Sequence, residues 1–137
     1  SYVSVWAWPF TKPLARLEGA GSSVEALTIS PDGTHLCLQG YESIEVLRVA
    51  DQSRVAITPN DFGGSGFSVA WSPDGGEIAS VQSKAIVFHR SDTLERLASV
   101  DLEFPSDAAF SPDARLVALG CWESGVLVER SSLTRSA

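Results

Sequence analysis

The strongest constraint on the fold is a short phrase that the chain repeats. Ser-Pro-Asp followed by Gly or Ala occurs at residues 30–33, 72–75 and 111–114, with spacings of 42 and 39 residues. A second pattern recurs independently. Short runs in which apolar residues alternate end at positions 6, 47, 88 and 129, which are three intervals of 41 residues. Two patterns with one period predict a repeated structural unit of about 41 residues.

The residues around each Ser-Pro-Asp phrase predict an antiparallel β-hairpin. Short apolar stretches lie on both sides of the phrase, and proline, serine and glycine suit the second, first and fourth positions of a type I turn. We therefore expect hairpin turns at 31–33, 73–75 and 112–114. Ala114 replaces the glycine in the third copy. A left-handed conformation costs alanine roughly 1 kcal/mol, so we expect that turn to be shaped differently.

Two more strands complete the unit, and the middle strands are apolar on both faces, as in sheets covered on both sides. The alternating runs form the third strand, and Trp71 and Phe110, at equivalent first-strand positions, should be core residues. The fourth strand is the most polar, as suits an outer edge. It is expected at residues 14–17, 54–57 and 94–100. Residues 93–100 also fit a helical turn, because Leu94 and Leu97 are three residues apart.

Four-stranded units of this length, each with Ser-Pro-Asp in its first hairpin, resemble the WD-repeat family of β-propellers. TolB-like and peptidase-associated propellers carry similar turns. The Trp-Asp dipeptide of the WD-repeat family matches only at Trp6, and its Gly-His pair aligns with Gly19-Ala20 in the first unit alone. The resemblance implies an all-β fold, a β-propeller segment of four-stranded antiparallel blades. We expect these blades to rely on apolar packing instead of the family's hydrogen-bonded network.

The strand count predicts a single partial propeller over residues 1–137. One strand at 2–7 precedes repeat units at approximately 8–48, 49–89 and 90–130, and the chain stops where another outer strand would begin. Because propellers close with about 4–8 blades, three units leave apolar faces open at both ends. We therefore expect a segment of a longer propeller. The alternative is a short protein that closes its ring by self-association.

Charge and composition exclude several classes of partner. The net charge is −7 with no basic cluster, which argues against binding to nucleic-acid phosphates. No apolar run approaches the roughly 18 residues of a membrane span. No signal peptide is visible, which favours a cytoplasmic protein, or a periplasmic or secreted one if a signal has been removed. Cys37 and Cys121 lack the spacing of a metal or redox site, and we expect buried thiols.

No set of residues indicates catalysis. His35 and His89 lie at different positions of different units, so a shared metal site is not expected. The three aspartates of the repeated turns are explained by turn hydrogen bonds. The glycine-rich stretch 61–66 lacks the Gly-Lys-Ser/Thr of a phosphate-binding loop, and we interpret it as a connection between blades. We expect no enzymatic activity, no cofactor and no metal.

One rim of the propeller should carry the binding surface. The loops between second and third strands and the loops between blades should lie at this rim. Trp122 sits on such a loop and is a candidate anchor for a partner. The candidate partner-binding residues are Tyr41, Glu42, Asp61, Phe62, Lys84, Trp122 and Glu123.

These expectations favour a non-enzymatic WD-repeat-like scaffold for protein–protein interaction. Its partners would be other proteins, the remainder of a parent propeller, or further copies that close the ring. One alternative is an accessory propeller domain of a larger enzyme, such as a peptidase. Another is a propeller that binds a small ligand or glycan, with Trp122 and Tyr41 as stacking platforms. Fold alone does not decide among these functions.

Overall fold

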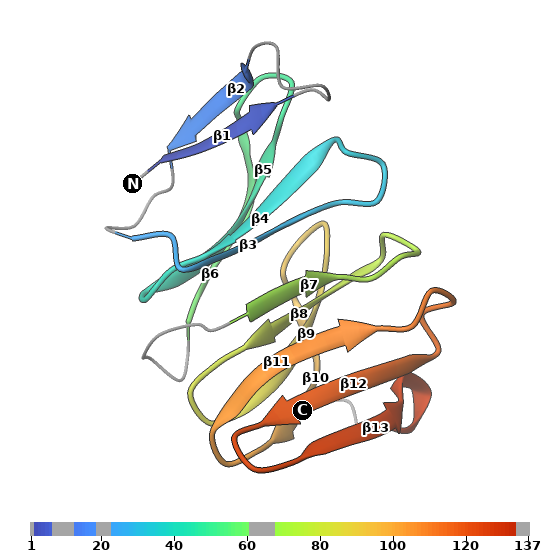
Figure 1. Ribbon diagram of the computed structural model, residues 1–137. Helices are drawn as coiled ribbons and strands as arrows, with labels where there is room; N and C mark the ends of the chain where they lie inside the picture. Colours follow the sequence, from blue (N-terminus) through green and yellow to red (C-terminus); the bar gives the residue numbers. More distant parts are fainter. Residues whose placement is uncertain (1, 7–12, 19–22, 61–67, 134–137) are drawn as a thin grey trace.

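The computed structural model describes residues 2–6, 13–18, 23–60 and 68–133. These residues form antiparallel strands in four sheets, which follow one another along the stack in chain order (Figure 1). No helix in the described ranges is long and apolar enough to cross a membrane. The chain is therefore an all-β, propeller-like array of sheets.

Each sheet is built from strands that are consecutive in the sequence. The first sheet contains β1 (Tyr2–Trp6) and β2 (Pro13–Glu18). The second contains β3 (Ala26–Ile29), β4 (His35–Gln39), β5 (Ser43–Arg48) and β6 (Arg54–Pro59). The third contains β7 (Ser68–Trp71), β8 (Glu77–Val81), β9 (Ala85–Arg90) and β10 (Arg96–Asp101). The fourth contains β11 (Pro105–Phe110), β12 (Leu116–Cys121) and β13 (Gly125–Glu129), followed by a short 3₁₀ helix at Arg130–Ser132.

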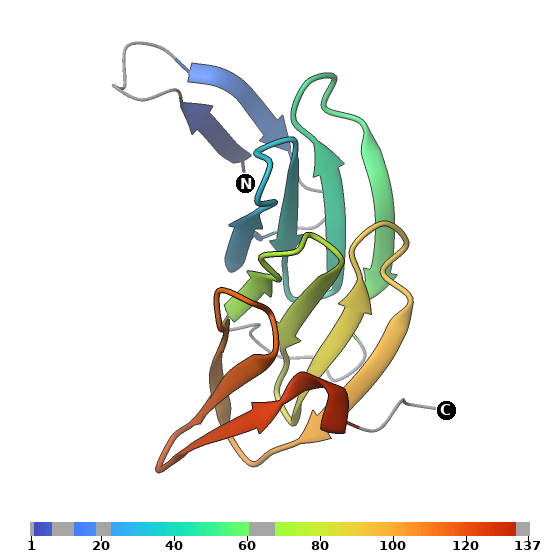
Figure 2. The ribbon, with the colours of Figure 1, turned by 90° about the vertical axis from the view of Figure 1, so that its right-hand side faces the viewer.

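This strand order confirms the predicted fold class. The second and third sheets are complete and have four strands each. The first sheet contains only the third and fourth strands of a blade, and the fourth sheet contains only the first, second and third strands. Figure 2 shows β3 and β7 along one side of the stack, with β6 and β10 along the other. The segment 93–100, which also fitted a helical turn, forms strand β10 from Arg96 onward. No fourth strand pairs with β13 within the described chain, where the 3₁₀ helix follows instead.

All three hairpin turns form as predicted, and the third has the same shape as the other two. The fourth residue of each turn donates its backbone N–H to the serine carbonyl at 2.9 Å. Ala114 has a φ of +60°, beside +74° for Gly33 and +82° for Gly75. The expectation of a different third turn was therefore wrong. The reason is that the serine and aspartate hydrogen bonds of this turn are each worth about 1 kcal/mol and together outweigh the strain on one alanine.

The turn aspartates are held by the same set of bonds. In the first turn, the hydroxyls of Ser30 and Thr34 donate to Asp32 Oδ1 at 2.6 and 2.7 Å, and Thr34 N–H donates at 3.0 Å. The Ser30 bond, followed by the Thr34 bonds, lowers the pKa of Asp32 to about 2. Hydrogen bonds from Ser72 and Ser111 likewise lower the pKa values of Asp74 and Asp113. These carboxylates therefore stabilise the turns by accepting hydrogen bonds within them.

The core is divided into layers between neighbouring sheets. On β4, Leu36 and Leu38 pack toward β1, while Cys37, between them, packs toward the third sheet. Phe88 packs on the other side of the third sheet, against Val117 of the fourth. The second strands β4 and β8 are therefore buried on both faces, as predicted, whereas Ala118 of β12 is exposed. Burial raises the pKa of the Cys37 thiol. Trp71 and Phe110, which were expected in the core, are only partly buried and pack against the edges of these layers.

The interior also contains buried hydrogen bonds, which corrects the expectation that the blades rely on apolar packing instead of a hydrogen-bonded network. In the third sheet, Gln82 donates to Ser80 Oγ at 3.0 Å, and that hydroxyl lies 2.9 Å from His89 Nε2. His89 Nδ1 donates to the Leu94 carbonyl at 3.1 Å. Gln39 donates its amide to the Val81 carbonyl at 2.7 Å and so ties the second sheet to the third. A buried polar chain thus supplements the apolar layers.

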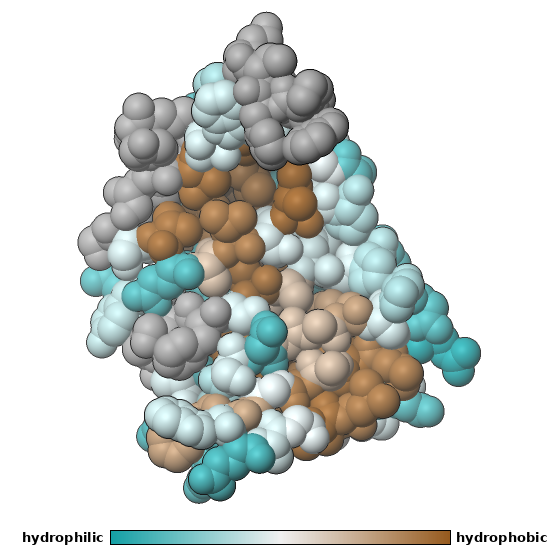
Figure 3. All heavy atoms as spheres, in the orientation of Figure 1, coloured by the Kyte–Doolittle hydropathy of each residue, from teal (hydrophilic) through white to brown (hydrophobic). Residues whose placement is uncertain are grey.

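The outer face of the fourth sheet is open. Leu127 of β13 is 66 % exposed, whereas its counterpart by strand register in β9, Phe88, is fully buried. Figure 3 shows hydrophobic side chains gathered over β12 and β13. Among the described residues no further sheet covers this face. The final sheet therefore exposes side chains that the inner sheets bury.

Candidate functional site

Backbone hydrogen bonds bring the predicted loops to one rim. Leu102 N–H donates to the Lys84 carbonyl, and Trp122 N–H donates to the Phe104 carbonyl, both at 3.1 Å. Asn60 N–H donates to the Glu42 carbonyl at 2.9 Å. Each bond joins the loop between a second and third strand to a loop that connects two sheets. The loops at 82–84, 102–104 and 122–124 are hereafter called the aromatic rim.

The predicted rim residues lie at these loops where they are described. Tyr41 and Glu42 are exposed between β4 and β5, and Lys84 is exposed between β8 and β9. Trp122 and Glu123 are exposed between β12 and β13. The other two candidates, at positions 61 and 62, lie outside the described residues.

An exposed aromatic pair dominates the aromatic rim. The ring of Phe104, which sequence reasoning missed, lies 6.2 Å from that of Trp122 at an interplanar angle of 77°. This is the edge-to-face arrangement that aromatic rings prefer. Phe104 is 68 % exposed and Trp122 is 82 % exposed. Two large aromatic side chains are thus paired with each other while both face solvent.

The backbone of Phe104 is strained. Its φ is +52°, a left-handed conformation that is rare for a bulky residue and costs on the order of 1–3 kcal/mol. The next residue, the buried Pro105, further disfavours helical angles at the residue before it. The bond from Trp122 N–H to the Phe104 carbonyl secures this geometry. The available signal in the sequence was an aromatic residue directly before proline in a short loop between blades.

Hollows lie on both sides of Phe104. One has a volume of about 670 Å³ and extends from Leu102 to Ser124. The other has a volume of about 540 Å³ and extends from Ser83 to Phe104. Leu102, Glu103 and Phe104 line both, so this connecting loop forms a ridge between two hollows.

The charges of the aromatic rim are predominantly negative. Glu103 and Glu123 lie in the loops of the aromatic pair, Asp101 lines the adjoining hollow at the end of β10, and Lys84 supplies one positive charge. In the described part of the chain, none of these three carboxylates has an ion pair or a side-chain hydrogen bond. The acids of the opposite rim differ, because the turn aspartates accept hydrogen bonds and Asp92 pairs with Arg90.

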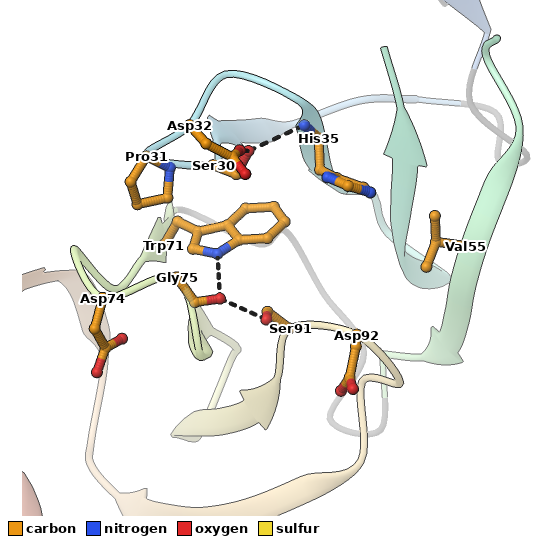
Figure 4. Close-up of a pocket in the computed structure, with 10 residues that line it drawn as sticks. All are labelled: Ser30, Pro31, Asp32, His35, Val55, Trp71, Asp74, Gly75, Ser91 and Asp92. Carbon is orange, nitrogen blue, oxygen red and sulfur yellow. Dashed lines mark hydrogen bonds between the residues drawn. The ribbon is translucent and has the colours of Figure 1, made fainter. Parts of the chain in front are cut away.

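The opposite rim carries a pocket between the second and third sheets (Figure 4). Its volume is about 310 Å³, and the Trp71 indole lies at its centre. Trp71 Nε1 donates to the Gly75 carbonyl at 3.1 Å, and the Ser91 hydroxyl donates to the same carbonyl at 2.6 Å. The carboxylates of Asp74 and Asp92 point away from the indole (Figure 4). Both hydrogen bonds lie within the third sheet, and they occupy the polar groups beside the indole.

The titratable residues that could bind a metal are dispersed. His35 lies beside Trp71, with ring centroids 6.5 Å apart, whereas His89 is buried within the third sheet. Both cysteines are free thiols, Cys37 buried and Cys121 partly exposed. Across the described ranges, no group of three or more histidine, cysteine or acidic side chains is placed to hold a metal ion.

The stacked four-stranded antiparallel sheets define a propeller-like fold. The chain is similar to one chain in the crystal structure of a mitotic checkpoint complex, with a TM-score of 0.73 and 19 % sequence identity. The match covers 92 % of this chain and 43 % of the other, so this chain spans less than half the length of that neighbour. No protein-family model and no curated protein sequence matches the chain. At this identity the similarity establishes the fold.

Proposed function

We propose that the chain is a WD-repeat-like propeller scaffold, built from units at 8–48, 49–89 and 90–130, that binds protein partners through the aromatic rim. The observation that carries the proposal is the exposed edge-to-face pair of Phe104 and Trp122. The structural neighbour, a chain of a protein complex, supports a role in protein interaction. The open face of the fourth sheet is proposed to be covered by the rest of a parent propeller or by a second copy.

The energetics of the aromatic pair favour an interface. Tryptophan and other aromatic residues are over-represented among the few side chains that dominate binding energy, and each buries up to about 150–250 Å². Trp122 leaves most of its surface in water, so a partner can still desolvate it. The left-handed backbone of Phe104, secured by the hydrogen bond from Trp122 N–H, places its ring beside Trp122 before any partner arrives, which reduces the ordering cost of association.

A selection experiment tests the proposal. A displayed peptide library is enriched on the immobilised 137-residue chain and then assayed on three variants. Trp122→Ala and Phe104→Gly should each weaken binding of the enriched peptides, by about thirtyfold for a dominant anchor. Glycine adopts a φ of +52° without strain, so the second variant removes the ring while preserving the loop.

Trp6→Ala is the matched control, because Trp6 is also exposed but lies on the first sheet. Its binding should equal that of the unmodified chain. Enriched peptides that bind the Trp122→Ala and Phe104→Gly variants as tightly as the unmodified chain would show that the partner surface lies elsewhere.

A further inference from the structure

We infer that the segment recognised by the aromatic rim is an extended, positively charged peptide whose apolar side chains enter the hollows on both sides of Phe104. This inference rests on the proposed function and specifies the chemistry of the partner. Three features carry it: unpaired carboxylates, a ridge between two hollows, and exposed aromatic faces.

The unpaired carboxylates select the sign of the partner's charge. Glu103 and Glu123 lie in the loops of the aromatic pair and Asp101 lines the adjoining hollow, each without an ion pair or side-chain hydrogen bond within the described residues. Lys84 offsets only one of them. Concentrated charge of one sign steers oppositely charged partners and repels like-charged ones. Arginine and lysine side chains are therefore favoured here, and acidic segments are disfavoured.

The hollows favour an extended backbone. Because successive side chains of an extended peptide point to opposite faces, alternate residues can follow one surface. A peptide that crosses the ridge at Phe104 can then place one apolar side chain in each hollow. The intervening side chains start from the opposite face, and the long, flexible stems of arginine or lysine allow them to fold back along the ridge toward Glu103 and Glu123. The exposed indole of Trp122 also offers a face to a guanidinium or ammonium group.

The chain uses the same chemistry inside its own fold. The Arg130 guanidinium lies 4.8 Å from the centre of the Phe88 ring and donates two hydrogen bonds to Glu77, at 2.7 and 2.8 Å. A carboxylate and an aromatic ring thus hold one cation between the third and fourth sheets. The aromatic rim also presents carboxylates beside aromatic rings, and we expect the partner to supply the arginine or lysine that binds them.

Binding of defined short peptides to the immobilised full chain tests the inference. All peptides share the same alternate apolar residues, and the intervening positions are arginine, glutamine or glutamate. The arginine peptides should bind most tightly and weaken as ionic strength rises, and the glutamate peptides should bind least. Glu103→Gln and Glu123→Gln should each weaken the arginine peptides by about threefold and leave the glutamine peptides unchanged. Glu95→Gln, an exposed carboxylate between β9 and β10, is the matched control and should change neither.

The outcomes separate this inference from the proposed function. If all peptides bind equally and Trp122→Ala weakens all of them, the aromatic rim remains a binding surface and the charge preference is wrong. If arginine peptides bind but Trp122→Ala and Phe104→Gly have no effect, the proposed site is wrong. Absence of binding by every peptide also overturns the inference. The competing ligand class is tested on a glycan array, where retention of glycans that Trp122→Ala abolishes would identify a carbohydrate site instead.

Discussion

Replacing Ala114 by glycine should stabilise the protein. Ala114 occupies a turn position with a φ of +60°, where glycine stands in the first two turns. A side chain in the left-handed conformation costs roughly 1–2 kcal/mol, and the greater freedom of glycine in the unfolded chain offsets part of the gain. We expect Ala114→Gly to raise the free energy of unfolding by about 1 kcal/mol. For a chain of this size that corresponds to about 4 °C in the melting temperature.

The first two turns provide the reciprocal experiment. A Cβ added at Gly33 or Gly75 would meet no atom within 4 Å, so alanine at either position creates backbone strain without a clash. Gly33→Ala and Gly75→Ala should each lower the free energy of unfolding by about 1 kcal/mol.

Urea unfolding followed by circular dichroism, at one fixed protein concentration, measures all three variants. The reasoning fails if Ala114→Gly leaves stability unchanged or lowers it while the two glycine variants are destabilised. Such a result would mean that Ala114 does not share the left-handed conformation of its counterparts.

Three further predictions concern the open face, a turn carboxylate and the thiols. The unmodified chain should sediment as species larger than a monomer. Leu127→Glu should shift the sedimentation toward the monomer, because it places a charge on the exposed apolar face. Sedimentation that is unchanged by this substitution would contradict the prediction. The folded pKa of Asp32, about 2, lies below its unfolded value of about 3.9, so its ionised form stabilises the fold above about pH 4 and this stabilisation is lost as the pH falls toward 2. The stability difference between the unmodified chain and Asp32→Asn should therefore shrink across that interval in urea unfolding, and a pH-independent difference would refute the assignment. Iodoacetamide should label the partly exposed Cys121 roughly tenfold or more faster than the buried Cys37, as measured by mass spectrometry, and equal rates would show that Cys37 is accessible.

The fold could be predicted because its signals are local. Each Ser-Pro-Asp turn carries its own hydrogen-bonding groups, and the adjacent apolar runs pair across it without help from distant residues. The same local reasoning failed at Ala114. It considered the backbone strain of alanine and left out the hydrogen bonds that stabilise the turn. There, Ser111 Oγ donates to Asp113 at 2.6 Å and accepts from Leu116 N–H at 3.0 Å.

The features that sequence reasoning missed depend on contacts between strands or loops. Ser80 meets His89 because the register of β8 against β9 makes them diagonal neighbours on one face. Phe104 turns its ring toward Trp122 through a backbone bond that joins two separate loops. Trp122 could be proposed from its loop position alone, whereas its aromatic neighbour required the three-dimensional arrangement.

The layered core has a consequence for how such a chain can lengthen or shorten during evolution. Each apolar cluster is shared by two adjacent sheets, and none spans the whole stack. Stability in such an array is approximately a sum of unit and nearest-neighbour terms. Gain or loss of a complete unit of about 41 residues therefore recreates an interface of the same type, whereas gain or loss of a single strand shifts every later strand to a different position in its sheet. Insertions and deletions in this gene are accordingly expected to be tolerated in multiples of the repeat length.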